Sequence, residues 1–282
     1  MALITTKTLL TDAYRNRYAV AAFAAHHLDM MKAVVEAAEE SGAPVILQTT
    51  PATIRYLGLE LIVAMARRVA EGVRVPVALH LDHGDTFETA VRCLRAGYTS
   101  IMVDASHLPF EENAAFVRRV TEAARAVGVP VEAELGTIGG AEDDVTREGE
   151  EGLTDPGAAE EFVRRTGIDF LAPAFGTAHG VYKGEVRLDL PRLEAIARRV
   201  DLPLVMHGAS GVPEEMLRRA IARGVSKVNF STELKQAFAR ALRSYLSDHP
   251  EEADPRRIFL SAKEAVKQVA KRKIEMVSGV VP

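Results

Sequence analysis

Three histidines, His83, His179 and His207, each end or closely follow a short apolar run of this sequence. Neutral imidazole is a preferred ligand of zinc, and catalytic zinc sites combine three protein ligands with one open coordination position. If the apolar runs are strands of one sheet, the three imidazoles converge at the same edge, which chance alone rarely produces. The sequence therefore predicts a divalent metal site, with zinc as the preferred ion.

Two carboxylates, Asp104 and Glu134, end further apolar runs. They are suited either to bind a metal directly or to accept hydrogen bonds from ligand histidines, and the sequence leaves both roles open. A histidine that stands alone is more often a hydrogen-bonded structural residue. We interpret His80, His107 and His249 in that way.

The last two apolar runs lead into segments of small and hydroxyl residues, HGASG at 207–211 and NFSTE at 229–233. Small residues let backbone N–H groups approach an anion, and Ser210, Ser231 and Thr232 add hydroxyl donors near expected helix starts. The alternative is that these hydroxyls only cap helices, a common role of serine and threonine. Beside three histidines, we favour a phosphate site.

The elements that must position these residues alternate between short apolar runs and longer amphipathic segments. Eight runs rich in valine, isoleucine and leucine lack strict polar alternation, which is typical of strands buried on both faces of a parallel sheet. The expected strands are residues 18–23, 45–48, 77–81, 100–103, 131–134, 170–173, 204–207 and 226–229. Eight strand-then-helix units predict an α/β protein with a (β/α)8 TIM-barrel fold, whose active site lies at the carboxyl ends of the strands.

Two segments fall outside this alternation. Residues 231–282 are expected to form extra C-terminal helices, with a break at the acidic stretch 249–254. Residues 136–154 are rich in glycine and acidic residues, so we expect a mobile loop after the fifth strand. No low-complexity linker divides the chain, and residues 1–282 are predicted to form a single domain.

Composition narrows the classes of function. The 282 residues carry a net charge of −4, which offers no basic field to attract nucleic acid or an acidic membrane surface. No run has the length of a membrane span, and the first residues do not form a secretion signal. Cys93 is the one cysteine and cannot form an internal disulfide. We therefore expect a cytoplasmic protein that binds neither nucleic acid nor membrane.

Five motifs, in order along the chain, resemble the signatures of the class II, metal-dependent ketose-bisphosphate aldolases. These motifs are HLDHG at 80–84, EAELGTIGG at 132–140, GTAHGVYKG at 176–184, HGASG at 207–211 and KVNFSTEL at 227–234. The similarity runs from the N-terminus through DPRR at 254–257, and it resembles the tagatose-bisphosphate branch slightly more than the fructose branch. It implies a TIM-barrel enzyme that reversibly cleaves fructose or tagatose 1,6-bisphosphate into dihydroxyacetone phosphate and glyceraldehyde 3-phosphate.

The resemblance implies which residues bind metal. His83, His179 and His207 match the catalytic Zn²⁺ ligands of the family, and Asp104 and Glu134 line an alternate or second metal position. Zinc bound there would stabilise the enediolate that forms when the carbon–carbon bond breaks. Family members also bind a monovalent cation, Na⁺ or K⁺, near the substrate phosphate.

The resemblance also implies which residues act on the substrate. Asp82 matches the residue that exchanges a proton with the substrate hydroxyl, and Glu142 matches a lid glutamate that handles the proton on the enediolate carbon. The positions that match the dihydroxyacetone phosphate end are Gly180, Lys183, Gly208, Ser210, Asn229, Ser231 and Thr232. Arg256 matches an arginine that binds the distal phosphate across a dimer interface, which implies a homodimer or homotetramer.

The chain departs from the family pattern after the first strand and just before the GTAHG segment. The family commonly has asparagine at the positions of Ala24 and His27, and an aliphatic residue at the position of Phe175. We expect these changes to lie near the mouth of the barrel and to affect the choice of substrate. A related phosphorylated keto-sugar, of the deoxy-keto-gluconate phosphate type, is therefore an alternative substrate.

Two other classes of protein fit these residues less well. A non-catalytic partner subunit of an aldolase has no need of the three histidines and Asp82, which are intact. An aldolase that works through a Schiff base needs a desolvated lysine at the barrel mouth. Lys183 lies between glycines and Lys227 near the start of the last run, which argues against that chemistry.

Overall fold

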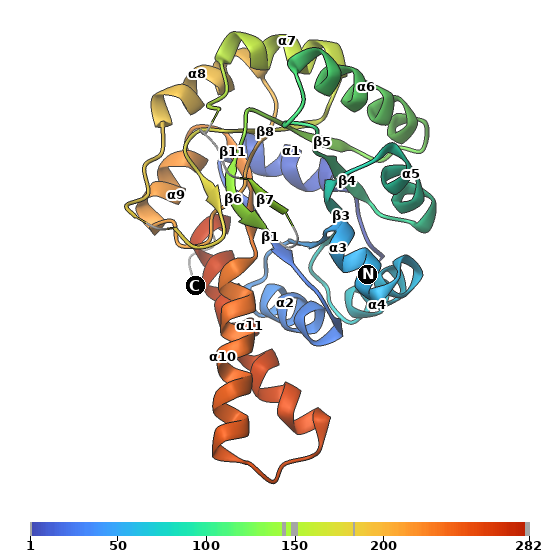
Figure 1. The fold of residues 1–282 in the computed structure, drawn as a ribbon, viewed down its shortest axis with the longest axis vertical. Helices are drawn as coiled ribbons and strands as arrows, with labels where there is room; N and C mark the ends of the chain where they lie inside the picture. Colours follow the sequence, from blue (N-terminus) through green and yellow to red (C-terminus); the bar gives the residue numbers. More distant parts are fainter. Residues whose placement is uncertain (1, 143–144, 148–151, 183, 280–282) are drawn as a thin grey trace.

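Eight parallel strands close into a barrel, as the eight apolar runs predict (Figure 1). The structure, a computed structural model, describes residues 2–142, 145–147, 152–182 and 184–279. The barrel strands are β1 (Val20–Ala24), β2 (Val45–Thr49), β3 (Val77–Gly84), β4 (Ser100–Val103), β5 (Val131–Leu135), β8 (Phe170–Pro173), β10 (Leu204–Met206) and β11 (Val225–Phe230). Each strand pairs with the next along the chain, and β11 closes the barrel against β1. The prediction of a TIM barrel is confirmed.

Helices cover the outside of the barrel and one of its ends (Figure 1). They are α1 (Thr6–Asn16), α2 (Leu28–Ser41), α3 (Pro51–Leu57), α4 (Leu59–Glu71), α5 (Phe87–Ala96), α6 (Phe110–Ala126), α7 (Pro156–Thr166), α8 (Leu190–Val200), α9 (Glu214–Ile221), α10 (Thr232–Asp248) and α11 (Pro255–Ser278). Polar caps fix where several of them begin: Asp155 accepts hydrogen bonds from the N–H groups of Gly157 and Ala158. None of the helices described is long and apolar enough to span a bilayer.

Helix α1 packs against the amino-terminal end of the barrel. Leu9, Leu10 and Ala13 of this helix form an apolar cluster with inward side chains of the strands. The hydroxyl of Thr6 donates to Oγ of Ser100 over 2.7 Å, which ties the helix to β4. The carboxyl ends of the strands remain as the end of the barrel where a site can form.

The chain after β11 forms two long helices, as the sequence predicts. Helix α10 ends at Asp248 and α11 begins at Pro255, so the break lies at the acidic stretch. Ion pairs join α11 to α2, including Lys263 to Glu36 at 2.6 Å. The far end of α10 and the start of α11 project beyond the barrel (Figure 1).

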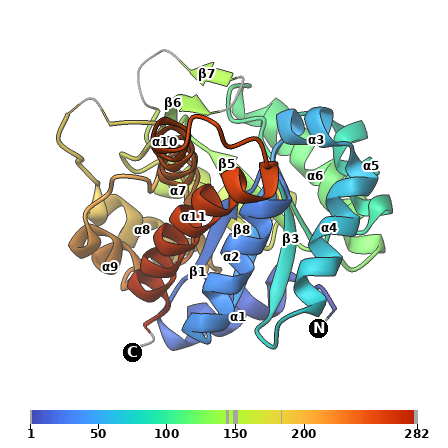
Figure 2. The same cartoon turned by 90° about the horizontal axis from the view of Figure 1, so that it is seen from below.

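The segment after β5 is more ordered than the sequence predicts. Residues 139–142 form β6 (Gly139–Glu142), which pairs antiparallel with β7 (Val145–Arg147). Strand β6 also pairs in parallel with β9 (Ala178–His179), a short strand outside the barrel. The expectation of a loop without packed elements is therefore wrong for residues 139–142 and 145–147, because an edge of β9 supplies backbone partners. Figure 2 shows β6 and β7 at the end of the barrel opposite α1.

Candidate active site

The three predicted histidines meet at the carboxyl end of the barrel. His83 lies near the end of β3, His179 ends β9, and His207 directly follows β10. Their ring centroids lie 5.1 Å apart for His83 and His179, 4.8 Å for His83 and His207, and 5.8 Å for His179 and His207. One nitrogen from each ring lies within 4.8 Å of the others. The geometry is that of three imidazoles grouped around one point.

His207 shows that this group fits a metal ion. Its Nε2 lies 2.8 Å from Oε1 of Glu132, and because a carboxylate only accepts, Nε2 carries the proton. Its Nδ1 is buried and has no hydrogen-bond partner among the residues that the structure describes. That nitrogen therefore presents a lone pair to the centre of the histidine group, as a metal ligand must.

Asp104 and Glu134 lie beside the same group. Oδ2 of Asp104 accepts from Nδ1 of His83 over 2.8 Å, which leaves Nε2 as the lone-pair nitrogen of that ring. His83, Asp104 and Glu134 also form a second group with ligand atoms within 4.8 Å of one another. Burial, and then the charge of Asp104, raise the pKa of Glu134. This geometry is compatible with both roles predicted for the two carboxylates. They can bind a metal directly, or they can accept hydrogen bonds from ligand histidines.

A buried ionic network underlies the histidines. Nζ of Lys227 lies 2.7 Å from Oε2 of Glu132 and 3.2 Å from Nε2 of His80, and all three side chains are fully buried. Burial works against ionisation of Glu132, but the charge of Lys227 and the hydrogen bond from His207 hold its pKa below the usual range. Burial, followed by the charge of Lys227, keeps the pKa of His80 well below its usual value. His80 is thus a buried, neutral, hydrogen-bonded residue, in line with its structural interpretation.

Asp82 is fully buried in β3, directly before His83. Its Oδ2 accepts a hydrogen bond from Nε2 of Gln48 at 2.6 Å, and its Oδ1 accepts from Nδ2 of Asn229 at 3.3 Å. Both carboxylate oxygens are therefore held by amide groups from neighbouring parts of the barrel. The sequence analysis did not single out Gln48, although a polar residue that ends an apolar run was a usable signal.

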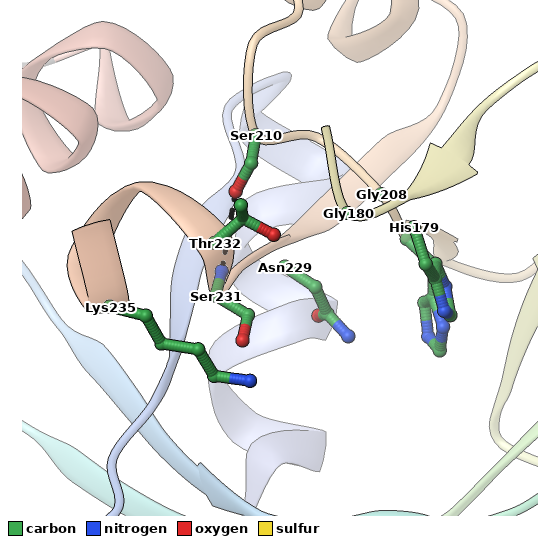
Figure 3. A pocket seen from close by; sticks show the side chains of 9 residues that line it. His179, Gly180, Gly208, Ser210, Asn229, Ser231, Thr232 and Lys235 are labelled. Atoms are coloured by element: carbon green, nitrogen blue, oxygen red, sulfur yellow. Dashed lines mark hydrogen bonds between the residues drawn. The ribbon is translucent and has the colours of Figure 1, made fainter. Parts of the chain in front are cut away.

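A pocket lies next to the histidine group, at the start of α10 (Figure 3). Its lining residues are His179, Gly180, His207, Gly208, Ser210, Asn229, Ser231, Thr232 and Lys235. Helix α10 begins at Thr232, so the positive end of its dipole lies at the pocket and would favour an anion there. Ser231 precedes this helix without making a side-chain capping hydrogen bond, so the alternative that it serves only as a cap is not supported.

Lys235 is a pocket residue that the sequence analysis missed. It extends from the first turns of α10 toward Ser231 and Asn229 (Figure 3). Its place four residues after Ser231 puts both residues on one face of the helix, which was a usable signal. A cationic side chain is thereby added to the small and hydroxyl residues of the pocket.

Three of the residues predicted to act on the substrate, Glu142, Lys183 and Arg256, are not brought to the histidine group or to this pocket by the described part of the chain. Lys183 and the side chain of Glu142 lie outside the described residues. The backbone of Glu142 ends β6, two residues beyond the Gly140 that pairs with His179. Arg256 is the second residue of α11, in the projecting part of the helical pair, where its guanidinium is exposed and lies 2.7 Å from Asp254.

The three departures from the family pattern lie in different parts of the structure. Ala24 ends β1 and is the register partner of Gln48 in β2. His27 caps α2, accepting from the N–H of Asp29 at 3.2 Å, and its ring packs against Phe238. Phe175 follows the carboxyl end of β8 and is fully buried in the main apolar core. Among these changes, Ala24 is the one linked to the site, through Gln48.

Comparisons with known proteins agree with this geometry. The family described as class II fructose-bisphosphate aldolase matches residues 4–280. A fructose-bisphosphate aldolase of Geobacillus stearothermophilus is 46% identical over 270 residues, which make up 95% of this chain and 94% of that protein.

Solved structures show the same likeness. The YdjI aldolase of Escherichia coli K12 matches with a TM-score of 0.88 and 33% identity, over 99% of this chain and 98% of that one. A candidate fructose-1,6-bisphosphate aldolase of Coccidioides immitis matches with a TM-score of 0.89 and 34% identity, over 97% of this chain and 96% of that one. With a family match over nearly its whole length and three histidines at the mouth of its barrel, this chain belongs to the class II fructose-bisphosphate aldolases.

Proposed function

We propose that this aldolase reversibly cleaves a ketose 1,6-bisphosphate, fructose or tagatose 1,6-bisphosphate, into dihydroxyacetone phosphate and glyceraldehyde 3-phosphate. The observation that carries the proposal is the convergence of three imidazoles and the buried Asp82 beside one anion pocket. A carbon–carbon cleavage next to a carbonyl needs an electrophile, a proton acceptor and a grip on the substrate. The three parts of this site match those three needs.

His83, His179 and His207 would hold the zinc ion. The nitrogen that presents a lone pair on His207 is fixed by Glu132, and on His83 by Asp104. Zinc, when bound, supplies a Lewis acid for the carbonyl and hydroxyl oxygens of the substrate. Asp104 and Glu134 would line an alternate or second position for the ion.

Asp82 would take the proton from the substrate hydroxyl at the carbon where the bond breaks. Its two oxygens are held by Gln48 and Asn229, so the carboxylate enters the reaction already oriented. Glu142 would move the proton at the enediolate carbon. The pairing of β6 with β9 supports this role, because Gly140 is the register partner of His179 and Glu142 follows two residues later on the same strand.

The pocket at the start of α10 would bind the phosphate of the dihydroxyacetone phosphate half. Its donors are the hydroxyls of Ser210, Ser231 and Thr232, with Lys183 and a monovalent cation, Na⁺ or K⁺, adding positive charge. Arg256 would bind the distal phosphate of a substrate in a second copy of the chain. Its exposure on the projecting end of the helical pair supports a homodimer or homotetramer.

A panel of phosphosugars tests this proposal. Metal-free and zinc-reloaded protein are each given fructose 1,6-bisphosphate, tagatose 1,6-bisphosphate and a deoxy-keto-gluconate phosphate, and the aldehyde product is measured. We expect cleavage of a ketose 1,6-bisphosphate by the zinc-loaded protein alone, with His207→Ala losing both zinc and activity. Cleavage by the metal-free protein would contradict the role of zinc. No cleavage of any sugar would instead indicate a partner subunit.

A further inference from the structure

Gln48 occupies a position in the barrel from which it can act on Asp82. It is the next-to-last residue of β2 and is fully buried. Its register partners are Ala24 on β1 and His80 on β3. Side chains at register partners point to the same face of a sheet. Because His80 contacts Lys227 inside the barrel, Gln48 also points inward, one layer below Asp82.

The hydrogen bond from Gln48 is the shorter of the two amide contacts to Asp82. It spans 2.6 Å, whereas the contact from Asn229 spans 3.3 Å. A carboxylate only accepts, so the amide nitrogen of Gln48 must face Asp82 and its oxygen must face elsewhere. A hydrogen bond to a charged group at this distance is among the stronger ones in proteins. Of these two amides, Gln48 therefore does more to fix the direction of the carboxylate.

The amide oxygen of Gln48 suits a ligand that donates hydrogen bonds. Oε1 of Gln48 is buried and accepts no hydrogen bond from the residues that the structure describes, and the same holds for Oδ1 of Asn229. Buried acceptors are nearly always satisfied in proteins. Two of them beside one carboxylate call for a ligand that carries several hydroxyl donors. A sugar chain in its open form has that chemistry.

Ala24 has no polar side-chain group that could position Asp82 in place of Gln48. It is the register partner of Gln48 on β1, is buried, and offers only a methyl group. We propose that Gln48 is the positioning residue of Asp82 and, through Oε1, a substrate-binding residue that helps to choose between sugars. The inference rests on the proposed function, because the ligand it names is the ketose bisphosphate and the group it positions is the proton acceptor.

Gln48 can discriminate between substrates that differ in configuration at carbon 4. Fructose and tagatose 1,6-bisphosphate differ in the direction of the hydroxyl at that carbon, which is the hydroxyl that Asp82 would deprotonate. A donor that sets the direction of Asp82 therefore favours one of the two sugars. Proton exchange at the reacting carbon of dihydroxyacetone phosphate does not involve that hydroxyl and does not depend on Gln48.

The test uses the zinc-loaded full chain with Gln48→Met, which nearly keeps the side-chain volume, and Gln48→Glu, which replaces the donor by a carboxylate. Gln268→Met, in an exposed glutamine of α11 that bonds Glu264, is the matched control. For each protein, zinc content, kcat and KM for both bisphosphates, and the rate of proton exchange on dihydroxyacetone phosphate are measured.

We expect Gln48→Met to retain zinc, to lose about 10- to 100-fold in cleavage kcat/KM, and to keep exchange within about twofold. The ratio of kcat/KM between the two sugars should change by more than about threefold. Gln48→Glu should lose at least as much cleavage, since like charges then face each other. The control should match the wild type.

Three results would overturn the inference. The first is cleavage by Gln48→Met and Gln48→Glu at the wild-type rate with an unchanged ratio between the sugars. The second is an equal loss of cleavage, exchange and zinc, which would show that Gln48 only supports the fold. The third is an unchanged ratio despite slower cleavage, which would remove the role in substrate choice. A wild type that cleaves neither sugar would instead reject the proposed function, so the two failures are distinguishable.

Discussion

Oε1 of Glu132 lies 2.8 Å from Nε2 of His207, so the tautomer of a proposed metal ligand is set from inside the barrel. The same carboxylate holds Lys227 through its other oxygen. Glu132→Gln removes the charge that supports both contacts. We expect zinc affinity to fall about 10- to 100-fold, measured by competition with a coloured chelator.

The change to Glu132 should also lower stability, because Lys227 is left buried without its anionic partner. Breaking such a pair costs about 3–5 kcal/mol, and urea unfolding of the metal-free protein measures it. Glu264→Gln, an exposed residue of α11, is the control. Zinc affinity equal to that of the wild type would show that His207 does not need this support.

Asp82→Ala separates proton transfer from metal binding. The variant should keep its zinc, because Asp82 is not among the proposed ligands, yet lose about 10²- to 10⁴-fold in cleavage, since the substrate hydroxyl has no acceptor. Metal analysis and steady-state kinetics on the same sample check both parts. Asp85→Ala, at an exposed neighbouring position, is the control. A loss of less than about tenfold would count against the role.

Glu142→Ala tests the residue at the end of β6. If its carboxylate moves the proton at the enediolate carbon, turnover should fall while substrate affinity changes little, because the interaction is used in the transition state. Isotope exchange at that carbon of dihydroxyacetone phosphate isolates the step. Glu185→Ala, an exposed position, is the control. Exchange at the wild-type rate would assign the proton to another residue.

Lys235→Met tests the cationic side of the pocket. The charge of Lys235 should contribute mainly to binding the phosphate, so we expect KM for the sugar bisphosphate to rise about tenfold with a small change in kcat. Inhibition by inorganic phosphate should weaken in parallel. Arg240→Met, an exposed cation on the same helix, should leave both quantities unchanged. If KM and phosphate inhibition both stay at wild-type values, Lys235 does not contact the phosphate.

The metal-free protein should become less stable in mild acid because of His80. Its folded pKa lies well below 6.5, first through burial and then through the charge of Lys227. Below 6.5 the unfolded imidazole binds a proton that the folded one does not, so the free energy of unfolding falls as the pH falls toward the folded pKa.

His80→Gln isolates this part of the acid sensitivity. Urea unfolding at about pH 8 and about pH 5.5 should show a smaller loss of stability in the variant than in the wild type. Equal losses in the two proteins would mean that His80 does not set this dependence.

The barrel could be predicted from the sequence because its strands are buried on both faces. Such strands appear as continuous apolar runs, and the predicted run 170–173 coincides with β8. The histidine group could also be predicted from the sequence, because residues that end parallel strands meet at one edge whatever the exact register. Predicting this group requires knowing the order of the strands, but it does not require knowing any side-chain contact.

The contacts inside the barrel could not be predicted in the same way. Lys227 and His80 are 147 residues apart, and their contact depends on the closure of β11 against β1. Gln48 has a partner only because β2 and β3 pair in a particular register. The hairpin of β6 and β7 was missed because its support, β9, lies about forty residues further along the chain and is itself two residues long.

His179 is carried by β9, which belongs to the small sheet with β6 and β7 rather than to the barrel. Gly140 lies so close to it that a Cβ there would collide with the backbone of His179. The imidazole of His179 thus belongs to the same small sheet as the backbone of Glu142. His83 and His207, in contrast, lie at the ends of barrel strands. For protein engineering, residues 139–142 and 145–147 should be exchanged together with residues 178–179, because grafting one part alone would misplace the imidazole of His179, a proposed ligand.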